Sequence, residues 1–340
     1  MFPKDYKPKL SYFETQKGIK LVRETFEKGM RERLSLQKIT APIFLKTGTG
    51  LQDDLAGTQV PVGFDLSFTE ASIEIVQALT KWKRQVLGKH EFDVGTGLIV
   101  DMKGIRKDEE LSEIHSIFVD QWDWERVISR KDRKLSFLKN VVRKIYLSIL
   151  DTEKVIESEF PALTPSLPKR IKFIHTQDLE RMFPDSTPKQ REHLIAEKYG
   201  AVFLVGIGHP LESGEPHDLR AADYDDWYIE AYDGKRGLNG DIIVWDGIRR
   251  KSMELTSMGI RVDSESLVRQ LEIMDLMDKK ELEYHSGIIE GRLPLTIGGG
   301  FGQSRLCMLL LKKAHIGEVQ SSVWPKEVEK GFEERGIPLL

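Results

Sequence analysis

Arg305 and the glycine-rich run before it are the residues best suited to chemistry on an anion. Arg305 lies in the first turn of an apolar run with helical spacing, and four of the five residues 298–302 before it are glycine. The positive end of a helix dipole disfavours a cation, so a buried arginine here needs an anion beside it. A protein carboxylate would serve as well as a phosphate. Because glycines let the backbone approach a ligand closely, they favour a ligand that carries phosphate.

A second set of polar side chains follows one predicted strand. In residues 117–125 a period of two places Gln121, Asp123 and Glu125 on one face and aromatic residues on the other. The simplest interpretation is the solvent-facing side of an antiparallel sheet. Arg106, at the end of the neighbouring predicted strand, favours a different one. A fixed cation beside a row of acceptors suits a substrate that carries both an amine and a carboxylate.

Two further carboxylates lie on adjoining predicted strands. Asp241 begins the run 241–245, and Glu254 lies near the start of the run 253–262. Mg²⁺ in nucleotide sites is usually held by one or two carboxylates together with substrate phosphates, so this pair would be sufficient. Taken alone, a purely structural pair of acidic residues is the more common situation.

The remaining candidates lie in segments that also have ordinary explanations. Arg220 and Asp225 belong to the dense polar segment 220–227, which suits an ammonium ligand and a solvated acidic turn equally well. Asp53 lies in the glycine-rich loop 48–57, where an aspartate commonly stabilises a turn.

The composition excludes several classes of protein. The chain has 340 residues with 51 basic and 54 acidic side chains, and its net charge of −3 argues against a dedicated nucleic-acid or membrane-surface protein. The single cysteine, Cys307, permits no internal disulfide. We find no signal peptide and no run of roughly 18 apolar residues, so we expect a cytoplasmic protein with no nucleic acid and no membrane among its partners.

Familiar short motifs are missing or incomplete. The sequence has no Gly-x-x-x-x-Gly-Lys-Ser/Thr loop and no His-Glu-x-x-His, and Gly206-Ile-Gly208 lacks the third glycine of a dinucleotide fingerprint. Lone histidines such as His175 and His285 are most simply structural.

The spacing of apolar residues, together with capping residues and prolines, predicts alternating strands and helices. Ser11 and Glu14 form a capping-box pattern at the start of a helix that reaches Leu34. An antiparallel hairpin is expected from 98–105 and 115–125, which argues against a purely parallel sheet. Further strands are predicted at 39–45 (with Pro42), 59–68, 73–76, 171–175, 201–206, 241–245 and 253–262, and further helices around 81–85 and at 135–159, 188–198, 265–275 and 303–313.

The predicted strands and helices, with the candidate residues on them, occur in the order expected of a class II aminoacyl-tRNA synthetase catalytic core. The sequence more closely resembles a family related to that core, the ammonia-dependent asparagine synthetases (aspartate–ammonia ligases). The resemblance covers nearly the whole chain. It rests on Thr80-Lys-Trp-Lys-Arg-Gln85, Val119-Asp-Gln-Trp-Asp-Trp-Glu-Arg126, Ala201-Val-Phe-Leu-Val-Gly-Ile-Gly208, Asp223-Tyr-Asp-Asp-Trp227, Gly237-Leu-Asn-Gly-Asp241, Ser257-Met-Gly-Ile-Arg-Val-Asp263 and Thr296-Ile-Gly-Gly-Gly300.

The resemblance implies an α/β fold of the α+β type, with a mixed, mainly antiparallel sheet flanked by helices. It also implies activation of L-aspartate by ATP and Mg²⁺ as β-aspartyl-AMP, which ammonia converts to asparagine, with AMP and pyrophosphate released. The implied catalytic residues are Asp53, Arg106 and Arg305. The implied aspartate contacts are Lys83, Gln121, Asp123, Arg220 and Asp225; the ATP contacts are Arg106, Asp241, Glu254, Gly300 and Arg305; and the metal ligands are Asp241 and Glu254.

The same resemblance implies a single catalytic domain over 1–340 with a helical excursion at about 131–160, and a homodimer built around Pro42. One alternative is an aspartyl- or asparaginyl-tRNA synthetase, which should carry an anticodon-binding domain and a basic face. A second is a synthetase-like regulatory subunit without chemistry. Retention of both arginines and both carboxylates of the predicted metal site argues against the second.

Overall fold

The computed structural model describes residues 2–53, 55 and 59–340. Its first long element is helix α1 (Tyr12–Leu34), which begins as the sequence predicts. The Ser11 side chain accepts the backbone N–H of Glu14, and the backbone N–H of Ser11 donates to the Glu14 carboxylate at 2.8 Å. These bonds satisfy donors that the start of a helix otherwise leaves unpaired, so they determine where α1 begins.

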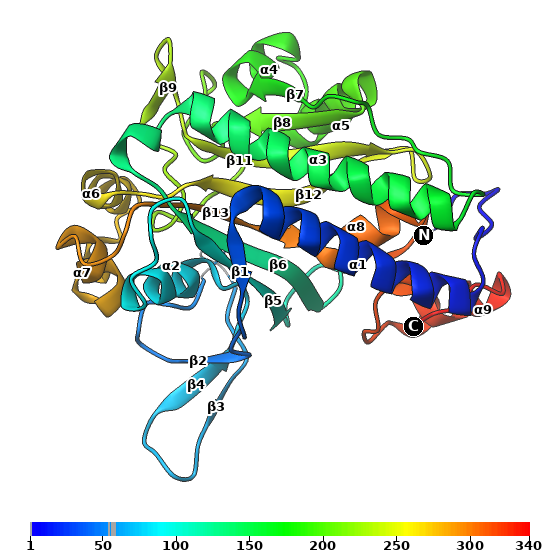
Figure 1. Cartoon of the computed structure of the whole chain (residues 1–340), viewed down its shortest axis with the longest axis horizontal. Helices are drawn as coiled ribbons and strands as arrows, with labels where there is room; N and C mark the ends of the chain where they lie inside the picture. The colour runs from blue at the N-terminus through cyan, green and yellow to red at the C-terminus, as the bar shows by residue number, and fades with distance from the viewer. Residues whose placement is uncertain (1, 54, 56–58) are drawn as a thin grey trace.

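An eight-stranded sheet forms the centre of the molecule (Figure 1). The outermost pair at each edge is parallel and the other neighbours are antiparallel. The prediction of a mixed, mainly antiparallel sheet is therefore confirmed. In order across the sheet, the strands are β1 (Leu36–Lys38), β5 (Gly97–Ile105), β6 (Phe118–Val127), β13 (Thr296–Gly302), β12 (Lys251–Ile260), β11 (Asn239–Asp246), β8 (Ala201–Val205) and β7 (Lys172–His175).

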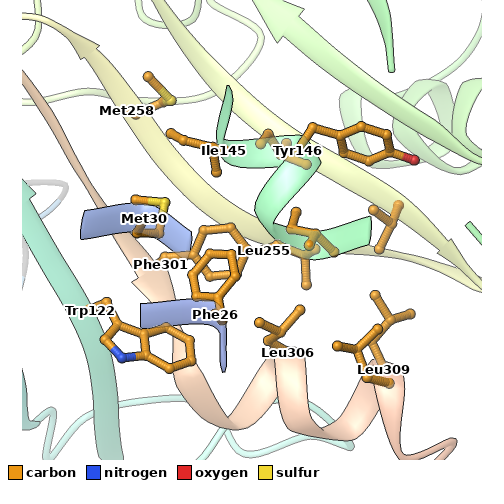
Figure 2. Packing of buried hydrophobic residues seen from close by; sticks show 14 of the residues in the cluster. Phe26, Met30, Trp122, Ile145, Tyr146, Leu255, Met258, Phe301, Leu306 and Leu309 are labelled. Atoms are coloured by element: carbon orange, nitrogen blue, oxygen red, sulfur yellow. The ribbon is translucent and has the colours of Figure 1, made fainter. Parts of the chain in front are cut away.

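One face of the sheet is covered by α1, α3 (Leu135–Glu159) and α8 (Gln303–Leu310), as Figure 1 shows. Figure 2 shows the resulting core, in which Phe26 of α1 lies between two aromatic side chains of the sheet. The ring centroid of Phe26 is 4.8 Å from that of Trp122 and 4.5 Å from that of Phe301. Because these residues anchor β6 and β13 on this face, the alternate residues of both strands point to the opposite face.

The opposite face carries two separate groups of helices. Helices α2 (Thr80–Lys89), α6 (Ser264–Ile273) and α7 (Glu283–Ile289) form one apolar cluster with β5. Helices α4 (Thr176–Met182) and α5 (Pro188–Tyr199) form another with β7 and β8. Between the two groups, β6, β12 and β13 present mostly polar side chains and glycines, and the candidate site lies there.

The region from 36 to 76 differs from the sequence-based expectation. Instead of one strand at 39–45, the chain forms β1 up to Lys38 and β2 (Phe44–Lys46), with Pro42 in the break. Proline has no N–H for a strand ladder, which explains the interruption. Strand β2 joins β4 (Ser72–Ile75) and β3 (Gly63–Asp65) in a small sheet that projects from the main body (Figure 1).

Other elements agree with prediction more closely. Helix α3 has the predicted bounds, and α8 ends at Leu310 rather than at 313.

None of the helices within the described residues is long and apolar enough to cross a membrane. The extent of the catalytic domain stays a prediction, and the predicted loop 48–57 lies partly outside the described residues. The smaller elements are β9 (Glu230–Tyr232), β10 (Lys235–Arg236), α9 (Lys326–Glu334) and 3-10 turns η1 (Arg130–Asp132), η2 (Met277–Glu281) and η3 (Ile316–Glu318).

Candidate active site

A cavity of about 340 Å³ opens on the polar face of the sheet, and Arg106 and Arg305 both line it. Two cations that are 199 positions apart in the sequence thus face one volume, as their predicted roles require. Among the other predicted site residues, Lys83 and Asp241 lie behind the lining. The remaining ones line the cavity: Asp53, Gln121, Asp123, Arg220, Asp225, Glu254 and Gly300.

Asp123 and Glu125 of β6 are buried and Gln121 is half-buried, and the glycines of β13 opposite them leave room for these side chains. A Cβ added at Gly300 would lie 2.5 Å from Oε1 of Gln121 and 2.7 Å from Oδ1 of Asp123. A Cβ at Gly298 would lie 1.9 Å from Oε2 of Glu125. The solvent-facing interpretation of these residues is therefore wrong. The space beside Gly300 accommodates Gln121 and Asp123, and Gly300 itself lines the cavity, so its contact with the nucleotide stays a prediction.

A β-bulge at Leu255 brings Glu254 to the cavity. In the antiparallel pairing of β12 with β11, Thr256 lies opposite Ile242 and Glu254 lies opposite Ile243, so Leu255 has no partner. The extra residue reverses the alternation of side chains along β12. Glu254 consequently points to the same face as the odd-numbered residues that follow the bulge, and it lines the cavity with them.

We call the part of the cavity formed by Arg106, Arg220, Glu254 and Arg305 the arginine end. Arg305 donates from Nη1 to the carbonyl oxygen of Glu254 at 3.0 Å and lies 3.9 Å from its carboxylate. Arg106 donates from Nη2 to the carbonyl oxygen of Gln77 at 3.3 Å. About a fifth of each side chain is exposed, 20% for Arg106 and 21% for Arg305. A guanidinium has five N–H donors, so both can accept an anionic ligand.

Arg220 is more tightly held than the other two arginines. Its Nη2 lies 2.6 Å from both carboxylate oxygens of Asp241. Burial and the nearby Glu254 carboxylate raise the pKa of Asp241 to about 7, although Arg220 opposes this rise. Burial opposes a decrease in the pKa of Glu254, but Arg305 and Arg220 lower it. The arginine end therefore has two carboxylates close enough to influence one another.

We call the part formed by Asp53, Gln121, Asp123 and Asp225 the carboxylate end. Arg261, the residue after the end of β12, holds it together, although the sequence had not suggested a role for it. Its Nε and Nη2 lie 3.0 and 2.9 Å from the two carboxylate oxygens of Glu125, and its Nη1 donates to Asp225. These side chains are almost completely buried. Bidentate pairing of this kind fixes orientation as well as charge.

Lys83 acts on the carboxylate end from behind. Its Nζ lies 3.0 Å from the carbonyl oxygen of Gly299 and 3.6 Å from Oδ1 of Asp123. The other oxygen of Asp123 accepts the backbone N–H of Leu79 at 2.9 Å. Burial lowers the pKa of Lys83, and the carboxylates of Asp123 and Glu125 oppose that decrease. Lys83 therefore helps to hold Asp123 in place, and its contact with aspartate stays a prediction.

The acidic segment 223–226 separates into three ion pairs. Asp223 bonds Lys81, Asp225 bonds Arg261, and Asp226 bonds Arg133. All three carboxylates are buried. The solvated-turn interpretation is therefore wrong, and only Asp225 of the three lines the cavity.

Two other details complete the lining. Asp53 is buried, and its Oδ1 accepts the backbone N–H of Leu55 at 2.8 Å, so it stabilises its turn while facing the cavity. Asp120, which the sequence reasoning did not select, accepts the Ser304 hydroxyl at 2.8 Å and Nη2 of Arg23 at 2.7 Å. Through these two hydrogen bonds, Asp120 of β6 connects the start of α8, which carries Arg305, to α1.

The fold is of the class II aminoacyl-tRNA synthetase type. The solved asparaginyl-tRNA synthetase of Pyrococcus horikoshii, complexed with asparaginyl-adenylate, matches with a TM-score of 0.66 and 14% identity over 92% of this chain and 70% of that chain. An aspartyl-tRNA synthetase of Entamoeba histolytica matches with a TM-score of 0.61 and 16% identity over 90% of this chain and 58% of that chain. At these identities the likeness concerns the fold alone.

Sequence comparison identifies a narrower group. A family model described as aspartate-ammonia ligase matches residues 13–336. An aspartate–ammonia ligase of Parabacteroides distasonis is 48% identical over 339 residues, which are 99% of this chain and 98% of that protein. One of Clostridium tetani is 49% identical over 341 residues, which are 100% of this chain and 97% of that protein. The chain belongs to the aspartate–ammonia ligase family, and the prediction from its sequence motifs is confirmed.

Proposed function

We propose that this chain synthesises L-asparagine from L-aspartate, ammonia and ATP through β-aspartyl-AMP, with AMP and pyrophosphate as the other products. The observation that carries the proposal is the cavity, where two incompletely paired guanidinium groups face the same volume as a buried row of carboxylates. Membership of the family supports the choice of substrates.

The first half-reaction joins the β-carboxylate of aspartate to the α-phosphorus of ATP and releases pyrophosphate. Such transfers depend mainly on positioning and on neutralisation of the phosphate charge. We assign Arg106 to the α-phosphate and the attacking carboxylate, and Arg305 to the distal phosphates. The partial exposure and spare N–H donors of both side chains support these assignments.

Asp241 and Glu254 are our proposed ligands for Mg²⁺, with phosphate oxygens completing its coordination. Glu254 lines the cavity, whereas Asp241 lies behind it with both carboxylate oxygens 2.6 Å from Nη2 of Arg220, so Arg220 would have to turn away for Asp241 to contact the ion. Among the described residues, no group of three or more His, Cys, Asp and Glu side chains could hold a metal ion without such help. When bound, the ion would supply further neutralisation of phosphate charge.

The carboxylate end is our proposed site for the amino acid. Gln121, Asp123 and Asp225 line it with fixed acceptors that suit the α-ammonium group. Lys83 and Arg220 were also predicted to contact aspartate. Their bonds support a different part for each: Lys83 orients Asp123, and Arg220 neutralises Asp241 at the arginine end.

The second half-reaction needs an acceptor for a proton. Amines with a pKa around 10 are protonated near neutral pH, so ammonium must lose a proton before its nitrogen attacks the β-carbonyl carbon. The new C–N bond then replaces the bond to the phosphate oxygen, the added nitrogen loses a second proton to the departing phosphate oxygen or to water, and AMP leaves. Asp53 is our candidate acceptor, because its buried carboxylate faces the carboxylate end.

The decisive assay measures AMP and asparagine after omission of each component in turn. We expect both products only when ATP, Mg²⁺, L-aspartate and ammonium are present together, with no product when glutamine replaces ammonium. Transfer of an amino acid to tRNA would instead favour the synthetase alternative. Absence of AMP under every condition would favour a regulatory subunit.

Two further expectations concern the state of the protein. We propose a homodimer, supported by the resemblance and by exposed apolar side chains beside Pro42, namely Ile43 and Phe44. Sedimentation analysis of the purified chain tests it, and a monomer at micromolar concentration would refute it. A cytoplasmic location is also part of the proposal.

A further inference from the structure

Three buried polar side chains behind the carboxylate end have no part in the chemistry described so far. Oδ2 of Asp223 lies 2.7 Å from Nζ of Lys81 and 2.9 Å from Nε2 of His285. Burial raises the pKa of Asp223, but the ammonium group of Lys81 and the hydrogen bond from His285 outweigh burial and lower it. Asp223 is therefore an ionised carboxylate. Nε2 of His285 therefore carries a hydrogen and donates it to Asp223.

These side chains adjoin the cavity lining on two sides. Asp223 immediately precedes Tyr224 and Asp225, which both line the cavity. Lys81 follows Thr80, another lining residue, in the first turn of α2. The trio thus supports the carboxylate end without facing it.

The other edge of the His285 ring packs against the loop that carries Asp53. A Cβ added at Gly50 would lie 3.2 Å from Nδ1 and 3.3 Å from Cε1 of His285. Gly50 has φ +76°, a conformation that side chains disfavour. Leu51 belongs to the same apolar cluster as Tyr284, the neighbour of His285 on α7. The histidine therefore lies between Asp223 and this loop.

Asp53 depends on that loop for its position. It follows Gly50 by three residues and is buried at the cavity. Burial and the negative charge of Asp53 both raise the pKa of Tyr224, which indicates that the two side chains are neighbours. A displacement of the loop at Gly50 would move the Asp53 carboxylate relative to the residues that follow Asp223.

We propose that His285 is a positioning residue for amide formation, which links Asp223 to the loop at Gly50 and thereby fixes the Asp53 carboxylate at the carboxylate end. The inference rests on the proposed function, because it assigns His285 to the second half-reaction. The first half-reaction also uses aspartate held at the carboxylate end by Gln121, Asp123 and Asp225, but it needs no proton acceptor at Asp53, so it is predicted to depend little on His285.

The test separates the two half-reactions in His285→Leu. Aspartate-dependent exchange of pyrophosphate into ATP reports the first, and asparagine formation at saturating ammonium reports the second. Because misplacement of a reacting group by about 1 Å can cost roughly 10²-fold, we expect asparagine formation to fall by about that factor and pyrophosphate exchange to stay within about twofold. His285→Gln, which keeps an N–H near Asp223, should recover most of the loss.

A double variant shows whether His285 acts through Asp53. If it does, His285→Leu should add little to the loss already caused by Asp53→Asn, because residues that act as one unit are not additive. The matched control is His175→Leu, a buried histidine that bonds the carbonyl oxygen of Arg236 outside this site. It should leave the ratio of the two half-reactions unchanged.

Several results would overturn the proposal. They are an equal loss in both half-reactions, full additivity with Asp53→Asn, or unchanged asparagine formation. If His285→Leu does not fold, Gly50→Ala decides, since its new methyl group should displace the loop and impair asparagine formation alone. Absence of both activities in the unsubstituted chain would refute the proposed function instead.

Discussion

The two ends of the cavity hold their positive charges in opposite ways. At the carboxylate end, Arg261 and Lys83 are buried and closely paired, Arg261 with two carboxylates and Lys83 with a carbonyl oxygen and Asp123. At the arginine end, Arg220 is closely paired with Asp241 in the same way, but Arg106 and Arg305 are about one-fifth exposed, and their nearest carboxylates lie 3.8 and 3.9 Å away. One end is organised before any ligand arrives, whereas the other keeps charge available for a ligand.

This difference separates stability from activity. A buried ion pair contributes mainly by preventing an uncompensated charge, so loss of one partner should destabilise the fold. A loosely paired cation contributes little to folding, but it can stabilise charge that develops on a substrate. Substitutions at the two ends should therefore be distinguishable by comparison of unfolding and catalysis.

Arg261→Met should have the largest effect, on stability. It leaves Glu125 and Asp225 buried without their guanidinium partner, which should cost about 3–5 kcal/mol in the free energy of unfolding. Urea unfolding followed by circular dichroism measures it. The control is Arg106→Met, which should change the free energy by no more than about 0.5 kcal/mol. Equal destabilisation by both would contradict the contrast between the ends.

Arg305→Ala should affect catalysis without affecting folding. Loss of a contact to developing phosphate charge should lower the rate of AMP formation by roughly 10²–10³-fold. The urea midpoint should stay close to that of the unsubstituted protein. Arg305→Lys keeps the charge but not the planar fork and should fall between the two. A near-normal rate in Arg305→Ala would remove the residue from the proposed mechanism.

Asp53→Asn should impair the second half-reaction much more than the first. Without a proton acceptor, asparagine formation should fall by about 10²-fold, the lower range for loss of a general base. Pyrophosphate exchange should change much less, because the first half-reaction needs no base. The two assays run in parallel provide the measurement. If both decrease by the same factor, Asp53 has no special part in the second step.

Gly300→Ala should have the smallest effect of this series. The new methyl group would displace Gln121 and Asp123, and loss of one charge-assisted hydrogen bond to the amino acid should raise KM for aspartate by roughly tenfold. KM for ATP should change little. Gly302→Ala is the control, since a Cβ there would only touch Arg305 at 3.4 Å. A rise in KM for ATP alone would indicate that Gly300 contacts the nucleotide and not the amino acid.

Local patterns predicted much of the fold and part of the site. The capping box at Ser11 and the apolar period of 135–159 predicted α1 and α3 because both patterns are contained in one element. Asp241 and Glu254 were correctly placed on adjoining strands. Pro42 indicated an unusual strand, but the break between β1 and β2 depends on where the chain leaves the sheet.

The residues that were missed act through tertiary contacts. Arg261 reaches the cavity face only because the bulge at Leu255 reverses the alternation along β12, and no pattern in the sequence marks that bulge. The positioning role proposed for His285 depends on its place between Asp223 and Gly50, which is set by the packing of α7 and cannot be seen in the sequence. Sequence periodicity gives the face of an ideal strand or helix but not its irregularities.

The bulge also has a mechanical consequence. Glu254, before it, belongs to the arginine end, and Arg261, which directly follows β12, belongs to the carboxylate end, so one continuous segment carries both. The separation of these two side chains is therefore set by the backbone of β12, which its neighbours in the sheet hold in place. A fixed separation of this kind would select for the length of the amino acid that lies between the two ends. Glutamate is one methylene longer, so its side-chain carboxylate would not lie where it can react with the nucleotide.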